Sequence, residues 1–223
     1  MSALFFGSIS TIADTSELQR QAFNEAFTSH GLDWSWDRDD YREQLTNNGG
    51  AKRIAEFAAA RGEDVDAAAV HRTKSETFQK LLGSSTVTPR PGVAETIRIA
   101  KGSGHQVALV TTTTPENVAA LLEALKGQIS RDDFDLVVDL TSVDEPKPDR
   151  AAYSYAMRTL DVQAEDCVAV EDNVGGVASA VAAGVVCVAF PNENTAGHDF
   201  AKAAAVVDHI DFEELRTFIK GEQ

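Results

Sequence analysis

The chain has 223 residues, and its 43% hydrophobic content is enough to bury one substantial core. It carries 35 acidic against 20 basic residues, a formal net charge of -15, so neither nucleic acid nor an anionic membrane is expected as a partner. Cys167 and Cys187 are isolated, which excludes a disulfide framework or a zinc site. No apolar run approaches the roughly 20 residues that cross a bilayer. We therefore expect a globular protein of the reducing cytosol.

The first half of the chain predicts one strand followed by helices. The apolar run ALFF at residues 3–6 predicts a buried strand. From about Thr15 to Leu82, helical segments follow one another with glycines between them and no convincing strand. The stretch GSSTVTPRPG then predicts an extended connector, because the residue before a proline is pushed out of the helical region.

The second half alternates β-rich runs with helical patterns, which is typical of a parallel α/β sheet. The expected strands span residues 106–110, 134–138, 167–170 and 185–190. The helical patterns are PENVAALLEALKG, PDRAAYSYAMRTL and GGVASAVAAG, and two of the three begin with a proline suited to a first turn. We predict a Rossmann-like parallel α/β core from residues 1–14 and 88–223, with a small helical domain at 15–87 inserted after the first strand.

Polar residues follow the predicted strands at their carboxyl ends, where ligands bind in open α/β sheets. Thr111 and Thr112 offer hydroxyls and amides that suit a phosphate or simply cap the next helix. Lys147, between two prolines, is either an anion ligand or a surface lysine. Glu171 and Asp172 are adjacent carboxylates, which usually need a cation to offset their repulsion, unless Asp172 or its neighbour caps the following helix.

A strand ending in Thr, a loop Lys-Pro and a strand ending in Glu-Asp, in this order, resemble the haloacid dehalogenase superfamily of phosphoryl-transfer enzymes. The helical insertion resembles the small cap of the β-phosphoglucomutase-like branch. The stretches GLDWSWDRDDYREQLTNNGGAKRIAEF, RPGVAETI, VTTTTPENV and PNENTAGHDFAKAAAVV look like the CbbY group of bacterial sugar-phosphate phosphatases. The resemblance covers nearly the whole chain, and it implies a Mg²⁺-dependent hydrolase with a phosphorylated sugar as ligand.

The opening segment FFGSISTIADTSE departs from the first motif of that family. Relatives carry F-D-x-D-G-T-L, in which the first Asp attacks phosphorus and the second is the general acid and base. Gly7 and Ile9 stand at these two positions, and neither side chain can perform that chemistry. Gln19 replaces a family His, whereas Asp14 and Thr15 keep the pattern.

Two serines are candidates to replace the lost nucleophile. Ser8, if it continues the strand, points to the face opposite positions 7 and 9 and is poorly placed. Ser10 lies in the loop and could reach the site, but a serine nucleophile needs a base within hydrogen-bonding distance. Ile9 supplies none, which leaves Glu171 as the candidate base.

The resemblance also implies where ligands would bind. Thr111, Thr112 and Lys147 would hold the phosphate. For Mg²⁺ only the Ile9 carbonyl, Glu171 and Asp172 remain, so metal binding is expected to be weak or lost.

Lys52 and Arg53 follow a Gly-Gly pair in the inserted helical domain. They could meet a second phosphate or sugar hydroxyls when that domain closes, or they could be solvated residues on a first helical turn. Trp34 and Trp36 are expected to pack within the inserted domain.

Two functions remain open. The first is a catalytically impaired pseudoenzyme that keeps a sugar-phosphate pocket and has a binding or regulatory role, with a protein partner left open. The alternative is an active or residual sugar-phosphate phosphatase that uses non-standard residues.

Overall fold

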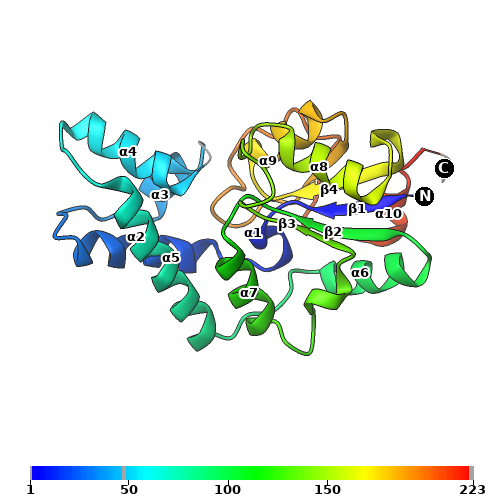
Figure 1. The fold of residues 1–223 in the computed structure, drawn as a ribbon, viewed down its shortest axis with the longest axis horizontal. Coiled ribbons are helices and arrows are strands. Elements are labelled where there is room, and N and C mark those ends of the chain that lie inside the picture. The colour runs from blue at the N-terminus through cyan, green and yellow to red at the C-terminus, as the bar shows by residue number, and fades with distance from the viewer. Residues whose placement is uncertain (1, 47–48, 221–223) are drawn as a thin grey trace.

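The computed structural model describes residues 2–46 and 49–220. Its centre is a six-stranded parallel sheet in the order β3-β2-β1-β4-β5-β6 (Figure 1). The α/β fold predicted from the alternating pattern is therefore confirmed. The strands are β1 (Ala3–Phe6), β2 (Gln106–Val110), β3 (Leu136–Val138), β4 (Cys167–Glu171), β5 (Val186–Ala189) and β6 (Ala205–Val206).

Strand β1 lies at the middle of the sheet, hydrogen-bonded to β2 on one side and β4 on the other. Phe6, its last residue, pairs with Leu109 of β2 and Val170 of β4. Because the three strands are parallel and in this register, the segments that follow them leave the sheet at the same edge. This register places Gly7, Thr111 and Glu171 near one another despite their distance in sequence.

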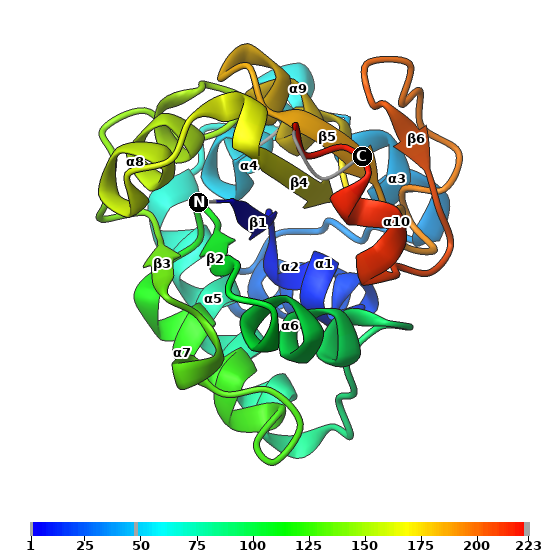
Figure 2. The same cartoon turned by 90° about the vertical axis from the view of Figure 1, so that its right-hand side faces the viewer.

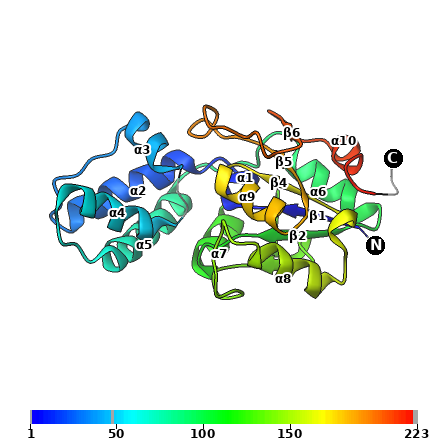
Figure 3. The same cartoon turned by 90° about the horizontal axis from the view of Figure 1, so that it is seen from above.

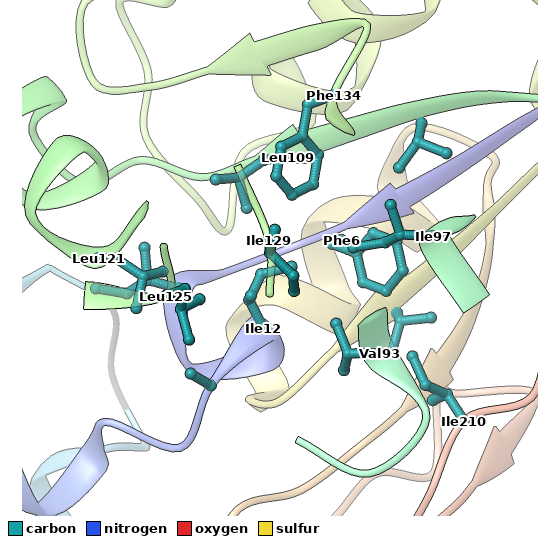
Figure 4. Close-up of a cluster of buried hydrophobic side chains, with 14 of the residues drawn as sticks. Phe6, Ile12, Val93, Ile97, Leu109, Leu121, Leu125, Ile129, Phe134 and Ile210 are labelled. Carbon is teal, nitrogen blue, oxygen red and sulfur yellow. The ribbon is translucent and has the colours of Figure 1, made fainter. Parts of the chain in front are cut away.

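Helices cover both faces of the sheet (Figure 2). Leu4 and Phe6 point to one face and join the larger hydrophobic cluster, part of which Figure 4 shows around Phe6. Phe5 points to the other face, as expected for the period of two in a strand. The first face is covered by α6 (Val93–Gly102), α7 (Pro115–Ala124) and α10 (Phe212–Arg216), and the second by α8 (Ala151–Leu160) and α9 (Val174–Ala182).

The helical insertion comprises α2 (Ser16–Ser29), α3 (Arg38–Gln44), α4 (Gly50–Arg61) and α5 (Ala67–Ser84). It has a hydrophobic cluster of its own, in which both Trp34 and Trp36 are buried, as expected. The strand arrows point toward the insertion, which lies beyond the carboxyl edge of the sheet (Figures 1 and 3). The insertion and the sheet edge therefore face each other.

Local differences from the predicted elements occur mainly at element ends. A short helix α1 (Ile9–Ile12) follows β1 directly, β3 begins at Leu136 rather than at residue 134, and α8 begins at Ala151, after rather than at its proline. The edge strand β6 and the 3₁₀ turns Arg131–Asp133 and Ala164–Asp166 were not predicted, because such short segments carry little periodicity. Among the described residues, no helix has the length and apolar character of a membrane span.

Candidate functional site

A pocket of about 220 Å³ lies between the carboxyl edge of the sheet and the helical insertion, and residues from both line it. The sheet side contributes the segment after β1 and the loop after β2, together with Lys147 and Asp172. The insertion contributes Arg53 of α4 and Lys74 of α5. The structure thus brings most of the predicted site residues to one cavity, together with side chains that the sequence patterns did not indicate.

Gly7 leaves space that the Glu171 side chain occupies. A Cβ atom placed on Gly7 would lie closer than 3.0 Å to the Glu171 carboxyl carbon, and a Cβ on Gly176 of α9 would do the same. The Glu171 side chain has no exposed surface and does not line the pocket. Its carboxylate is therefore enclosed between Gly7, which directly follows β1, and Gly176 of α9. Burial raises the pKa of Glu171, although the charge of Lys147 opposes that shift.

Lys147 donates short hydrogen bonds to the residue that follows β1 and to the last residues of β2 and β4. Its Nζ atom donates to the Gly7 carbonyl at 2.5 Å, the Val110 carbonyl at 2.6 Å and Glu171 Oε1 at 2.6 Å. An ammonium group has three protons, so these short hydrogen bonds use all of them. Tyr153 donates to the same Glu171 oxygen at 2.7 Å. In this geometry Lys147 is the buried counter-ion of Glu171.

Ser8 is not turned away from the site, and this part of the sequence prediction is wrong. The strand ends at Phe6, so the alternation of side chains no longer applies, and Ser8 becomes the N-cap of α1. Its hydroxyl accepts from the amides of Ser10 and Thr11 and donates to Asp172 Oδ1 at 2.6 Å. A serine and a carboxylate therefore meet at the pocket wall.

Ser10, in contrast, has no base beside it. Its Oγ atom contacts Thr15 Oγ1 at 2.9 Å and accepts from Gln19 Nε2 at 3.3 Å. Glu171, its candidate base, is bound by Lys147 and Tyr153 and does not line the pocket.

Asp172 is surrounded by hydrogen-bond donors. Its Oδ1 atom accepts from Ser8, from Thr11 Oγ1 at 3.3 Å and from Asn173 Nδ2 at 3.1 Å, and its Oδ2 atom accepts from Asn192 Nδ2 at 2.8 Å. The N-cap of α9 is Asn173, whose side chain accepts from the Gly176 amide. Of the two residues that the sequence offered as the cap of this helix, Asn173 is the cap and Asp172 is not.

The loop after β2 lines the pocket with Thr111 to Thr114. Thr114 caps α7 by accepting from the Asn117 amide, and Pro115 occupies the first turn as predicted. Thr111 accepts from the Thr113 amide at 3.2 Å. The loop therefore places hydroxyl groups and the positive end of a ten-residue helix at the cavity.

Lys52 and Arg53 separate in the structure because neighbouring residues on a helix point in different directions. The Lys52 side chain is 69% exposed and lies 3.7 Å from Glu56. Arg53 is buried, lines the pocket and donates through Nε to the Gln44 carbonyl at 2.7 Å. Of these two residues, Arg53 lines the pocket and Lys52 does not.

Lys74 is a pocket residue that the sequence patterns did not single out. It is 4% exposed, its Nζ donates to Gln19 Oε1 at 2.9 Å, and it lies over the rings of Phe23 and Phe78. Burial, reinforced by Arg53, lowers the pKa of Lys74 to about 7. The available signal was its spacing, since Val70, Lys74, Phe78 and Leu82 form one i, i+4 stripe on α5, all of them buried.

His71, one turn before Lys74, also lines the pocket. Burial, together with the nearby charges of Lys74 and Arg53, lowers the pKa of His71 to about 4. The imidazole is therefore neutral near pH 7.

The residues present do not fit the Mg²⁺ that the resemblance implies. Positions 7 and 9 supply no carboxylate, Glu171 is paired with Lys147, and both oxygens of Asp172 accept hydrogen bonds. The unpartnered Glu171 Oε2 atom is buried and does not open to the cavity. Within residues 2–46 and 49–220, no cluster of three or more His, Cys, Asp or Glu side chains could hold a metal ion.

Relatives of known name match the chain along most of its length. CbbY of Cereibacter sphaeroides is 41% identical over 209 residues, which cover 92% of this chain and 91% of that protein. The plasmid-encoded CbbY of Cupriavidus necator is 36% identical, with 94% of this chain and 86% of that protein covered.

Solved structures agree with the sequence matches. CbbY from Rhodobacter sphaeroides in complex with phosphate superposes with a TM-score of 0.86 at 40% identity, covering 94% of each chain. A mutant of the same protein in complex with xylulose-(1,5)bisphosphate has a TM-score of 0.87 at 40% identity, again covering 94% of each chain. The family model for haloacid dehalogenase-like hydrolases matches residues 1–184. This chain belongs to the haloacid dehalogenase-like hydrolase family.

Proposed function

We propose that this chain binds a phosphorylated sugar in the pocket between the sheet and the helical insertion and does not hydrolyse it. The main support for this proposal is that one cavity lacks carboxylates at positions 7 and 9 but contains several groups that can bind an anion. Positions 7 and 9, where the family pattern has its reacting carboxylates, hold Gly7 and Ile9, whereas groups suited to an anion remain at Thr111, Arg53 and Lys74. The pocket of the sugar-phosphate phosphatase family is kept while its reacting groups are lost.

The large rate acceleration that phosphate-ester hydrolysis requires supports the proposed absence of turnover. Enzymes accelerate phosphate-monoester hydrolysis by as much as about 10²¹-fold, and positioning of the substrate supplies only part of such a factor. Neither glycine nor isoleucine can attack phosphorus or transfer a proton. The role that fits best is sensing a sugar phosphate or regulating a protein partner, in the cytosol.

The ligand class follows from the relatives. Their complexes hold phosphate and xylulose-(1,5)bisphosphate. Two phosphates need positive groups at two places, and in this pocket the helix α7 start on the sheet side faces Arg53 and Lys74 on the insertion side. A sugar bisphosphate is therefore the first ligand to test.

The test combines a binding assay with a turnover assay on the same preparation. Xylulose-1,5-bisphosphate should raise the melting temperature in a concentration-dependent manner, since a ligand that binds only the folded state stabilises it. Released phosphate, measured in parallel, should stay at the level of the no-protein blank. Sustained release above that level would overturn the proposal.

One observation favours residual hydrolysis as a second candidate function. The Ser8 hydroxyl donates to Asp172 at 2.6 Å, so Ser8 Oγ could attack phosphorus while its proton passes to Asp172 and the bond to the sugar oxygen breaks. Two features oppose it. Asp172 accepts three further hydrogen bonds from Thr11, Asn173 and Asn192, and Ile9 provides no proton for the leaving sugar oxygen.

A further inference from the structure

The described lining of the pocket is cationic, although the chain as a whole has a net charge of -15. Asp172 is the one carboxylate among the described lining residues, and Arg53, Lys74 and Lys147 are the cationic groups. In a partly enclosed cavity, such a local excess of positive charge attracts an anion more strongly than the net charge would indicate. The pocket lining therefore carries more positive than negative groups, whereas the whole chain carries a net negative charge.

Lys147 contributes little of this attraction to a ligand. Its three protons are bound to Gly7, Val110 and Glu171, and only 5% of its side chain is exposed. A phosphate could gain a short hydrogen bond from Lys147 only by displacing one of these buried acceptors. The ion pair with Glu171 is possible in this position because Gly7 has no side chain.

Glu171, at the end of β4, thus supplies the negative charge that position 7, directly after β1, lacks. This arrangement neutralises Lys147 inside the protein and leaves no carboxylate at positions 7 and 9 to repel a phosphate dianion. The remaining carboxylate, Asp172, has both oxygens occupied by hydrogen-bond donors. A divalent cation is therefore not required to offset repulsion between the site and its ligand.

Lys74 is the cation best placed to bind that ligand. It is buried at the pocket wall, and it donates a hydrogen bond to the neutral Gln19 rather than to a carboxylate. Two of its protons remain for an acceptor in the cavity. A charge-assisted hydrogen bond in a dry site is among the stronger polar contacts available to a phosphate.

We infer that this pocket binds phosphate esters without Mg²⁺, with Glu171 as the internal counter-ion of Lys147 and with Lys74, rather than Lys147, as the main ligand-binding lysine. The inference rests on the proposed function, since it specifies how the same pocket holds its ligand.

The experiment titrates the full chain with xylulose-1,5-bisphosphate and, separately, with inorganic phosphate by calorimetry. Each titration is run after dialysis against EDTA and again in millimolar Mg²⁺. We expect Kd values in the two conditions that agree to within about twofold, because no charge in the site depends on the cation. Mg²⁺ without a ligand should leave the melting temperature unchanged.

A variant pair assigns the binding lysine. Lys74→Met should weaken binding of the bisphosphate by about tenfold or more, the loss expected for one charge-assisted hydrogen bond. Met is apolar and of similar length, so it suits the buried stripe of α5. The matched control is Lys80→Met, an exposed lysine on the same helix, and it should bind like the wild type.

The outcomes separate the inference from the proposed function. Binding that strengthens about tenfold or more in Mg²⁺, or that is unchanged in Lys74→Met, overturns the inference and leaves the proposed ligand class standing. Binding of neither probe in either condition overturns the proposed function and the inference with it. Metal-independent binding that is lost in Lys74→Met supports both.

Discussion

The Glu171 carboxylate occupies the volume into which a side chain at Gly7 would project. Gly7 directly follows β1 and Glu171 is the last residue of the adjacent strand β4, and the ion pair between Glu171 and Lys147 depends on the space that Gly7 leaves. Glu171 therefore places a negative charge beside Lys147 in the space that a side chain at position 7 would need. This arrangement also makes a carboxylate at position 7 difficult to introduce with a single substitution.

Gly7→Ala should destabilise the fold, although alanine is ordinarily harmless at a loop position. The added Cβ would overlap Glu171, which has no exposed surface to move into and has Gly176 on its other side. Displacing one partner of a buried ion pair costs on the order of 3 kcal/mol of unfolding free energy. Urea denaturation measures the change, with Gly83→Ala as the matched control, because the space around Gly83 is open. A Gly7→Ala protein as stable as the wild type would contradict the packing described.

Transferring the carboxylate from position 171 to position 7 should recover part of the stability that each single substitution loses. Gly7→Asp adds a carboxylate where Glu171 already lies, and Glu171→Ala leaves Lys147 without a counter-ion, so each single variant should lose stability. In the double variant, Asp at position 7 can pair with Lys147 in the vacated space. We expect a favourable coupling of roughly 0.5–3 kcal/mol in a double-mutant cycle. Strict additivity of the two losses would show that the positions do not share one volume.

Restoring both reacting carboxylates tests whether the family site can be rebuilt. Gly7→Asp with Ile9→Asp should lower stability without metal, because the new carboxylates repel Asp172 and crowd Glu171. Added Mg²⁺ should then raise the melting temperature of this variant but not that of the wild type. Phosphate release from xylulose-1,5-bisphosphate is the second measurement. A folded double variant that gains neither response would show that the site has changed beyond these two positions.

Anion affinity should fall as pH rises through about 7, because Lys74 loses its proton there. The groups that face it are Arg53, which stays charged, and His71, whose pKa of about 4 keeps it neutral. Sulfate is the suitable probe, since its charge stays constant between about pH 6 and pH 9. Lys74→Met should abolish the pH dependence of the sulfate Kd. A wild-type Kd that is constant over this range would refute the assignment.

The same lysine predicts how stability varies with pH. The unfolded chain holds the Lys74 proton up to its ordinary pKa of 10.5, whereas the folded chain releases it near 7. Between these values the unfolded state binds more protons, so this residue's contribution to stability rises with pH, and its full penalty is present below about 7. Lys74→Met should therefore raise the melting temperature more at pH 6 than at about pH 10. The exposed control Lys80→Met should show no such difference.

Ser8 and Ser10 separate the two candidate functions. If trace phosphate release is real, Ser8→Ala should remove it, because the Ser8 hydroxyl donates to Asp172, and Ser10→Ala should leave it, because the Ser10 hydroxyl is hydrogen-bonded to Thr15 and Gln19. Our expectation is that neither variant differs from the wild type, whose release stays at the blank level. A loss of about tenfold confined to Ser8→Ala would favour the residual phosphatase.

The sequence by itself determined the fold class and the absence of a carboxylate at positions 7 and 9. Alternating strand and helix patterns specify a parallel α/β sheet, because the period of side-chain burial differs between the two elements. The order of Thr111, Lys147, Glu171 and Asp172 located the carboxyl edge of the sheet. That Gly7 and Ile9 carry no reacting group follows from their chemistry alone and needs no coordinates.

Only the tertiary structure decided which polar groups of the pocket are paired with one another. Glu171 and Gly7 are far apart in the chain, and the pairing of β1 with β4 makes them share one volume. The end of β1 at Phe6 turned Ser8 toward Asp172, against the strand alternation. Helical phase exposed Lys52 and buried Arg53, and the packing of the insertion made Lys74 a pocket residue. The physical reason is the same in each of these cases, because the burial of a side chain and its hydrogen-bond partners depend on segments that are distant in sequence.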